Sequence, residues 1–151
     1  MEAKDFIVLL YYKYVPLENA KQYAADHLKL CKSLGLNGRI LIADEGINGT
    51  VAGTHEATKK YEDLMHADPR FADMQFKEGF GEEDTFKKMF VRYRPELVTL
   101  NVPEVDVQKN GEYLTPQKFN EMVENDKDVV LVDMRNLYEY NLGRFKNAVP
   151  M

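Results

Sequence analysis

The chain has 151 residues, of which 44% are hydrophobic and 30% charged, and its formal net charge at pH 7 is −5. This length and composition fit one globular domain, or one small domain followed by part of another. No apolar run is long enough to span a bilayer and the N-terminus lacks the order of a secretory signal, so we predict a cytoplasmic protein without membrane contact. The acidic total argues against a general nucleic-acid coat, although it permits a local basic patch.

The sequence offers few groups for metal or redox chemistry. Cys31 is the only cysteine, which excludes an internal disulfide and a cysteine-based zinc site within one chain. The three histidines, His27, His55 and His66, show no ligand spacing. Cys31 and His27 fall on the apolar stripe of a predicted helix, where both are expected to be packed rather than catalytic. No metal site or cofactor is therefore expected in this chain.

The chain begins with a strand and a helix. The apolar run Phe6–Tyr12 predicts a buried central strand, with the pair Tyr11–Tyr12 in the core. Apolar residues at three- and four-residue spacing predict a helix over Glu18–Leu34. Gly35 is expected to end this helix as a C-terminal cap.

The next segments complete a recognisable order of elements. We predict a strand at Arg39–Ala43, a loop at Asp44–Asn48, a strand at Gly49–Gly53, a helix at His55–His66 and an edge strand at Met74–Phe80. The order β-α-β-β-α-β is typical of the α+β ferredoxin-like sandwich, an antiparallel four-stranded sheet with both helices on one face.

A second region follows a further strand-like run at Phe86–Tyr93. Thr115 and Pro116 are typical of a helix N-terminus, and the helix is expected to reach Glu124. A short buried strand at Val129–Val132 and a helix near Leu137–Leu142 come next. These elements bury too little apolar area to fold alone, so we expect the truncated start of a second domain. The predicted organisation is a ferredoxin-like domain at 1–98, a connector at 99–114 and a partial domain at 115–151.

Two stretches carry candidate binding residues. In the predicted loop, Asp44, Glu45, Gly46 and Asn48 could contact a base edge, a ribose hydroxyl or a cation, although a self-bonded turn is favoured from the residues alone. The run 86–94 holds four basic residues and no acidic one. A basic face with an interleaved aromatic suits phosphate contact and base stacking, while a charged edge strand protected from aggregation is an equal alternative. The candidates for RNA contact in this run are Lys87, Lys88, Phe90, Arg92 and Arg94.

The second region contains one further polar pair. Asp133 and Arg135 follow the predicted strand, where the carboxylate and the guanidinium could pair or the guanidinium could bond nearby carbonyls. Such pairs are more often structural than catalytic, and we interpret this one as structural.

Together these stretches resemble the rhodanese-domain tRNA-uridine hydroxylases. The segment Asp44–Thr50 is the most specific match, followed by the lysine-rich strand that leads to Glu96–Leu100. The pattern Asp133-x-Arg135, Tyr138-Glu139 and Gly143-x-Phe145-x-x-Ala148 resembles the start of a rhodanese domain. The resemblance runs from Phe6 to Pro150. It departs from the common rhodanese pattern at Arg144, where a histidine is usual, and at Asn147, where a glycine is usual.

The resemblance implies an acylphosphatase-like, ferredoxin-fold N-terminal domain followed by a rhodanese domain. It also implies oxygen-dependent hydroxylation of the wobble uridine of tRNA to 5-hydroxyuridine, with the tRNA anticodon arm as partner, molecular oxygen as co-substrate and no role for DNA. The essential cysteine of such enzymes is expected downstream of Pro150. This chain alone is therefore expected to be inactive and to hold no catalytic residue.

The residues bear on three other functions. Acylphosphatase activity is rejected because 13–19, after the first strand, contains no arginine to hold a phosphate. A rhodanese-type sulfurtransferase is the main alternative, with the first domain as a specificity module. A non-catalytic RNA-binding module is the third possibility.

Overall fold

The computed structural model describes residues 6–83, 85–97, 111–126 and 128–151. The chain divides into two compact units, residues 1–109 and 110–151, each considered by itself. The connector predicted at 99–114 lies mostly outside the described residues and stays a prediction, as do the predicted domain limits.

A five-stranded sheet forms the first unit. Its elements in chain order are β1 (Phe6–Tyr14), α1 (Ala20–Ser33), β2 (Asn37–Ala43), β3 (Gly46–Thr54), α2 (His55–Ala67), β4 (Lys77–Phe80) and β5 (Met89–Tyr93). The strand order is β4-β1-β3-β2-β5, in which the first four strands are antiparallel and β5 joins β2 in parallel. The four antiparallel strands and two helices form the predicted ferredoxin-like arrangement, and the run predicted at Phe86–Tyr93 supplies the fifth strand.

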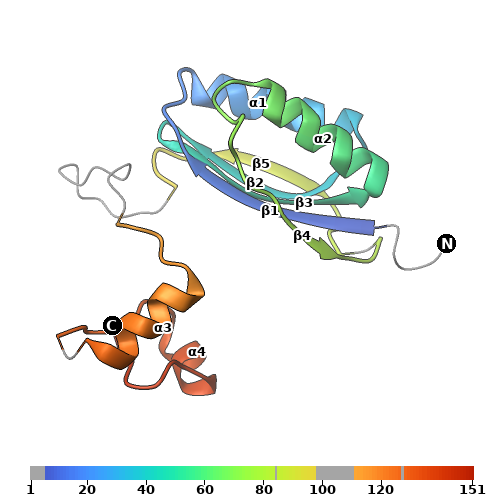
Figure 1. The fold of residues 1–151 in the computed structure, drawn as a ribbon. Helices are drawn as coiled ribbons and strands as arrows, with labels where there is room; N and C mark the ends of the chain where they lie inside the picture. Colours follow the sequence, from blue (N-terminus) through green and yellow to red (C-terminus); the bar gives the residue numbers. More distant parts are fainter. Residues whose placement is uncertain (1–5, 84, 98–110, 127) are drawn as a thin grey trace. The chain divides into compact units, whose positions relative to one another are not determined.

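Both helices lie on the same face of the sheet (Figure 1), as the prediction required. Helix α1 packs over β2 and β5, and α2 packs over β3 and β1. The core between the helices and the sheet is almost entirely apolar, and its largest fully buried members are Tyr61, Phe71, Leu9, Leu36, Ile40, Ile42, Ile47, Val51 and Cys31. We call the opposite face of the sheet the open face.

One-sided packing corrects the prediction that Phe6–Tyr12 is buried throughout. Ile7, Leu9 and Tyr11 point into the core, whereas Leu10 is 46% and Tyr12 53% exposed. The side chains of a strand alternate between the two faces, so a strand with helices on one side only can bury every second residue. Tyr11 is a core residue as predicted, and the same prediction for Tyr12 is wrong.

The loop predicted at Asp44–Asn48 is shorter in the structure. Ala43 pairs with Gly46, so Asp44 and Glu45 form a two-residue hairpin turn and Gly46 already belongs to β3. Gly46 has φ 149°, and a Cβ there would collide with the carbonyl oxygen of Lys13. The glycine lets the turn approach β1 closely, which explains why a loop-like sequence continues directly into a strand.

The helix ends follow local sequence rules. The N–H of Gly35 donates to the carbonyl of Lys32 (3.1 Å), and that of Leu36 donates to the carbonyl of Cys31 (3.0 Å). With Gly35 at φ 71°, these bonds form a Schellman motif and confirm the predicted cap. At its other end α1 begins at Ala20 rather than Glu18, because Asn19 is in the left-handed region at φ 55°.

The second unit has well-formed elements but almost no core. It contains α3 (Pro116–Asn125), β6 (Val132–Asp133), α4 (Leu137–Leu142) and β7 (Val149–Pro150), with β6 and β7 parallel. Thr115 accepts a bond from the N–H of Lys118, which confirms the predicted N-cap. Ala148 is the only buried hydrophobic residue among those described in this unit. The prediction of a buried strand at Val129–Val132 is therefore wrong. Val130 is 74% exposed, and the strand starts only at Val132.

The core of the first unit depends on a glycine beneath Tyr11. A Cβ at Gly49 would lie 2.5 Å from the Tyr11 ring, so we expect Gly49→Ala to lower the free energy of unfolding by about 1–3 kcal/mol. Gly79→Ala is the matched control, because a Cβ at Gly79 meets nothing within 4 Å. Urea unfolding of both variants measures the difference. Equal stability of the two would contradict the close contact between Gly49 and Tyr11.

Candidate nucleic-acid interface

The predicted basic strand is β5, at the edge of the sheet beside β2. Its side chains alternate between the two faces: Met89 is buried and Val91 and Tyr93 are partly buried on the helix side, while Phe90 and Arg92 reach the open face. Phe90 is 43% exposed. The Arg92 guanidinium carbon lies 5.9 Å from the centre of the Phe90 ring, so the cation stands beside an accessible aromatic surface.

Basic residues continue at both ends of this strand. The N–H of Gly38 donates to the carbonyl of Lys88 (3.2 Å), and the N–H of Arg94 donates to the carbonyl of Ile42 (2.9 Å). These bonds hold the backbone at Lys88 and Arg94 against β2. Lys87, Lys88 and Arg94 are all exposed. The structure therefore fixes the backbone of the strand and leaves its cationic side chains in water.

The sheet brings further residues to the same face. Arg39 of β2 is the cross-strand neighbour of Phe90, and Leu41 that of Arg92. Across the rest of the sheet, Arg39 continues through Thr50 and Leu10 to Lys77, and Leu41 continues through Asn48 to Tyr12. The sequence alone does not single out Arg39, Lys77 or Tyr12, because only the register shows that they share a face with β5.

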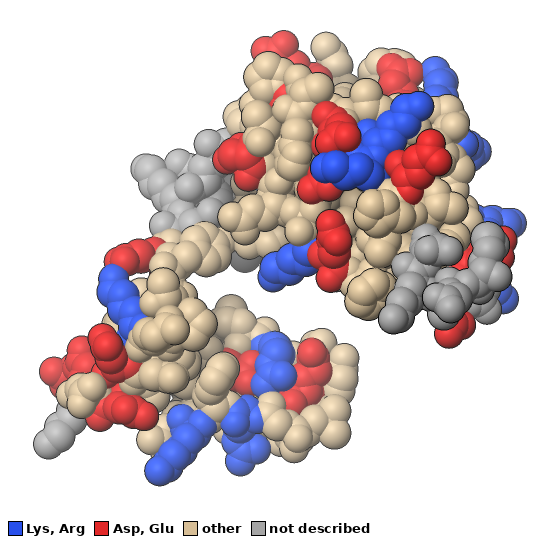
Figure 2. Space-filling model, turned by 45° about the vertical axis from the view of Figure 1, so that its right-hand side comes forward, with Lys and Arg blue, Asp and Glu red and all other residues tan. Residues whose placement is uncertain are grey.

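Several cations elsewhere in the first unit are held in ion pairs, whereas the described cations of the open face are not. Lys29 pairs with Asp26, Arg70 with Asp68, and Lys59 with Glu62 and Asp63; Lys13 pairs with Asp73. Within the described part of the chain, none of Arg39, Lys77 and Arg92 forms an ion pair. Figure 2 shows another view of the surface, where acidic and basic side chains are interspersed.

The two carboxylates of the hairpin turn have partners within the fold. The Tyr93 hydroxyl donates to Asp44 Oδ2 (3.0 Å), and the N–H of Leu97 donates to Glu45 Oε1 (2.6 Å). The bond to Asp44 raises the pKa of Tyr93. The turn thus fastens the end of β5 and the residues that follow it. Asn48 is separate from this network and lies exposed on the open face.

Three buried residues of the first unit, Tyr11, Tyr61 and His27, form a chain of hydrogen bonds in the core. The Tyr61 hydroxyl lies 2.5 Å from the Tyr11 hydroxyl and 2.8 Å from His27 Nε2. Burial lowers the pKa of His27 to about 4, so the imidazole is neutral near pH 7. Burial raises the pKa of the Cys31 thiol to about 12, which removes the thiolate needed for nucleophilic attack. Both residues are packed, as predicted.

The described residues contain no group of three or more His, Cys, Asp or Glu side chains placed to hold a metal ion. No helix among them is long and apolar enough to cross a membrane.

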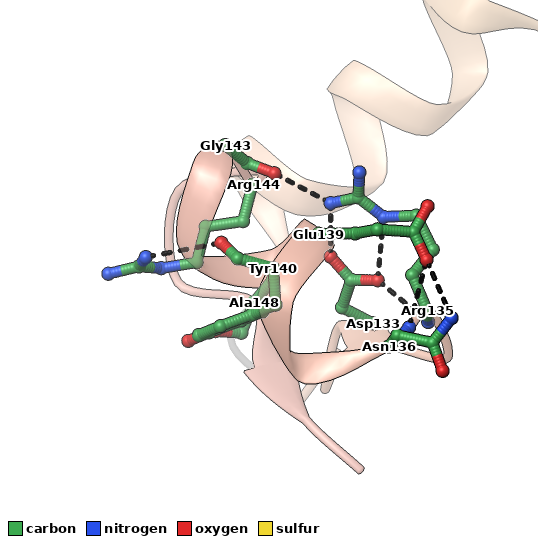
Figure 3. A network of polar contacts seen from close by, with 8 residues as sticks. All are labelled: Asp133, Arg135, Asn136, Glu139, Tyr140, Gly143, Arg144 and Ala148. Carbon is green, nitrogen blue, oxygen red and sulfur yellow. Dashed lines mark hydrogen bonds and ion pairs between the residues drawn. The ribbon is translucent and has the colours of Figure 1, made fainter.

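In the second unit the predicted pair is present (Figure 3). Arg135 forms two bonds with the carboxylate of Asp133, 3.0 and 2.7 Å long, and its Nη2 also donates to the carbonyl of Gly143 (2.6 Å). Arg135 therefore joins the end of β6 to the end of α4, which confirms that the pair forms and that the arginine bonds a nearby carbonyl. The contacts indicate a structural role.

The two departures from the rhodanese pattern have local explanations. Asn147 has φ 65°, a left-handed conformation that favours glycine and that asparagine tolerates. Arg144 lies over the Tyr140 ring at 4.4 Å, and the Tyr140 hydroxyl donates to the carbonyl of Ala148 (2.9 Å). Both residues suit the turn between α4 and β7.

The family model described as the UPF0176 acylphosphatase-like domain matches residues 6–97, which is the whole described sheet and both of its helices. The chain belongs to this family. The match confirms the predicted α+β, acylphosphatase-like fold.

Curated relatives extend the similarity to the second unit. The chain is 54% identical over 154 aligned residues to a protein of Streptococcus suis named tRNA uridine(34) hydroxylase, which covers 97% of this chain and 47% of the relative. A protein of the same name from Streptococcus sanguinis is 53% identical with the same coverage. The chain thus spans about half the length of the curated relatives that it matches. The resemblance to tRNA-uridine hydroxylases is confirmed.

Among solved structures, the dark state of BlrB, a BLUF protein, is similar with a TM-score of 0.50 and 19% identity, over 60% of this chain and 73% of that one. At this identity the likeness concerns the fold alone.

The buried histidine makes stability depend on pH. An unfolded histidine has a pKa of ~6.5, so the lower folded value of His27 contributes stability above pH ~6.5 that is lost as pH falls toward 4, about 3 kcal/mol in all. We expect His27→Gln to remove this part of the pH dependence in urea unfolding between pH 7.5 and 4.5. His55→Gln, at an exposed histidine, is the control. The same pH slope in wild type and His27→Gln would contradict the assignment.

Proposed function

We propose that this chain is the N-terminal half of an enzyme that hydroxylates uridine 34 of tRNA. The observation that supports it most strongly is the identity of more than half the residues with proteins of that name, over nearly the whole chain. The identity includes the second unit, whose Asp133–Arg135 pair resembles the start of a rhodanese domain. The product would be 5-hydroxyuridine, with molecular oxygen as the co-substrate.

The chemistry itself would take place outside this chain. The only cysteine, Cys31, is fully buried with a raised pKa, so it is unsuited to be the essential cysteine that the resemblance implies. The curated relatives are about twice as long as this chain, which leaves room for a cysteine-bearing loop in the other half of the parent protein. By itself the chain would be inactive.

The first unit would hold the tRNA. Phosphate groups need accessible cations, and β5 presents Arg92 between Lys88 and Arg94 without an ion pair in the described residues. Lys87 would add a further phosphate contact. We place the anticodon arm here because the modified uridine has to lie near the enzyme surface that orients it.

The turn at Asp44–Asn48 would have two separate roles. Asp44 and Glu45 accept bonds from Tyr93 and Leu97, so they would position β5 and the chain that follows it. Asn48 is exposed on the open face, where its amide could donate to and accept from a base edge. Gly46 would serve this arrangement by allowing the tight approach to β1.

Removal of two cations tests the phosphate contacts. In the full-length parent we expect Arg92→Gln with Arg94→Gln to weaken tRNA binding regardless of tRNA sequence. The slope of log affinity against log salt should fall by about 0.7–0.9 for each lost phosphate contact. Filter binding at salt concentrations between roughly 50 and 200 mM measures both the affinity and its dependence on salt.

The control for this experiment changes charge without touching β5. Lys29→Gln with Lys59→Gln removes two exposed lysines of α1 and α2 that are paired with carboxylates. We expect affinity and salt slope to stay close to wild type. Unchanged affinity of the variant with both Arg92 and Arg94 replaced would contradict the proposal that tRNA binds at β5.

The reaction is tested in cells. Deletion of the parent gene should remove 5-hydroxyuridine from tRNA, and the full-length gene should restore it. Normal modification in the deletion strain, together with thiosulfate-to-cyanide transfer by the purified parent, would favour a rhodanese-type sulfurtransferase instead.

A further inference from the structure

The open face combines features that phosphate contact alone does not require. Arg39, Lys77 and Arg92 are exposed on its strands, and every charged strand position on this face within the described residues is basic. The chain as a whole carries −5. A concentration of cations without carboxylates, on an otherwise acidic protein, is complementary to a polyanion.

Aromatic rings stand among these cations. Phe90 is 43% and Tyr12 53% exposed. Their neighbours Met89 and Tyr11 are buried on the helix side of the same strands. The Arg92 guanidinium beside the Phe90 ring enlarges the flat surface on which a base could stack. Unpaired bases of RNA are recognised by stacking on aromatic and guanidinium planes, whereas the bases of a duplex are not accessible in this way.

The spacing of the rings defines the ligand further. Tyr12 is on β1 and Phe90 on β5, three strand spacings apart in the order β1-β3-β2-β5, which is about 14 Å across the sheet at ~4.8 Å per spacing. Because Tyr12 lies in the row of Arg92, the two rings are also offset by two residues, roughly 7 Å, along the strands. Between them lie Asn48 and Arg39, whose side chains can bond base edges or phosphates. One RNA strand crossing the sheet could therefore meet both rings.

We propose that the open face is a stacking platform for single-stranded RNA, in which Phe90 and Tyr12 receive unpaired bases, Arg39 and Arg92 contact phosphates near these bases, and Lys77 on the edge strand β4 contacts the RNA backbone beyond Tyr12. This rests on the proposed function and deepens it, because it assigns the unpaired loop of the tRNA, rather than its helical stem, to this surface. Arg39, Lys77 and Tyr12 join the residues of β5 as members of one site.

The first test compares ligands and variants by fluorescence anisotropy. The chain is titrated into a labelled uridine-rich single strand and into the same strand paired with its complement. We expect the single strand to bind more tightly, and Phe90→Leu and Tyr12→Leu to weaken it by roughly 5- to 100-fold each. Phe80→Leu is the matched control, because Phe80 is 80% exposed at the sheet edge but shares the face of Ile7, on the helix side.

The second test reports stacking directly. The chain has no tryptophan, so Phe90→Trp introduces a single indole on the open face. We expect this variant to keep its affinity and to lose emission when the single strand binds, while Phe80→Trp keeps its emission. As a control, the unfolding midpoint of each variant is measured, and a value close to wild type would show that the substitution leaves the fold intact.

The outcomes separate this proposal from the one on which it rests. Equal binding of single strand and duplex, or wild-type affinity of Phe90→Leu and Tyr12→Leu, would overturn the stacking platform while leaving the phosphate contacts of β5 intact. Wild-type affinity of Arg39→Gln and Arg92→Gln as well would overturn both. Failure of the chain to bind the single strand would overturn the stacking platform.

Discussion

The sheet of the first unit has helices on one face only, and this one-sided packing decides which side chain of every strand is buried. Ile7, Leu9 and Tyr11 meet the helices, so Leu10 and Tyr12 must face away from them. The same constraint turns Phe90 and Arg92 outward once Met89 is buried. The apolar core and the candidate interface are therefore two consequences of a single pattern, and neither can move in register without the other.

The surfaces on the two sides of the sheet also differ in charge. On the helices and loops, several lysines and arginines form ion pairs with carboxylates, as Lys59 does with Asp63 at 3.0 Å. On the open face, every charged strand position in the described residues is basic, and these positions are Arg39, Lys77 and Arg92. Exposed pairs contribute little to stability, so the difference matters less for folding than for what each surface can bind. The backbone hydrogen bonds of the sheet fix the positions of these residues, and those bonds do not require the cationic side chains.

Local rules explain what could be predicted from the sequence, and long-range pairing explains what could not. Gly35 as a cap and Thr115 as an N-cap follow from a few neighbouring residues, and the structure confirms both. Gly46 appeared to belong to a loop because its pairing with β1, which brings it close to Lys13, comes from a strand distant in the sequence. Arg39 and Phe90 are neighbours only through the parallel pairing of β2 and β5. The fold and the basic strand could be predicted from the sequence, whereas the residues that β1, β2 and β4 add to the open face could not.

The second unit shows what hydrogen bonds achieve without a core. Arg135 links Asp133 to Gly143, and the Tyr140 hydroxyl reaches Ala148, so the turns of this unit are fixed by polar contacts between nearby residues. Such bonds specify geometry but each adds only about 1 kcal/mol to stability. Val130 and Leu142 remain 74% and 86% exposed, and Ala148 is the only buried hydrophobic residue among those described in this unit. The polar network would then serve to hold a strand and a helix in the geometry that further apolar packing requires, and the stability of this unit would come from that packing rather than from the network.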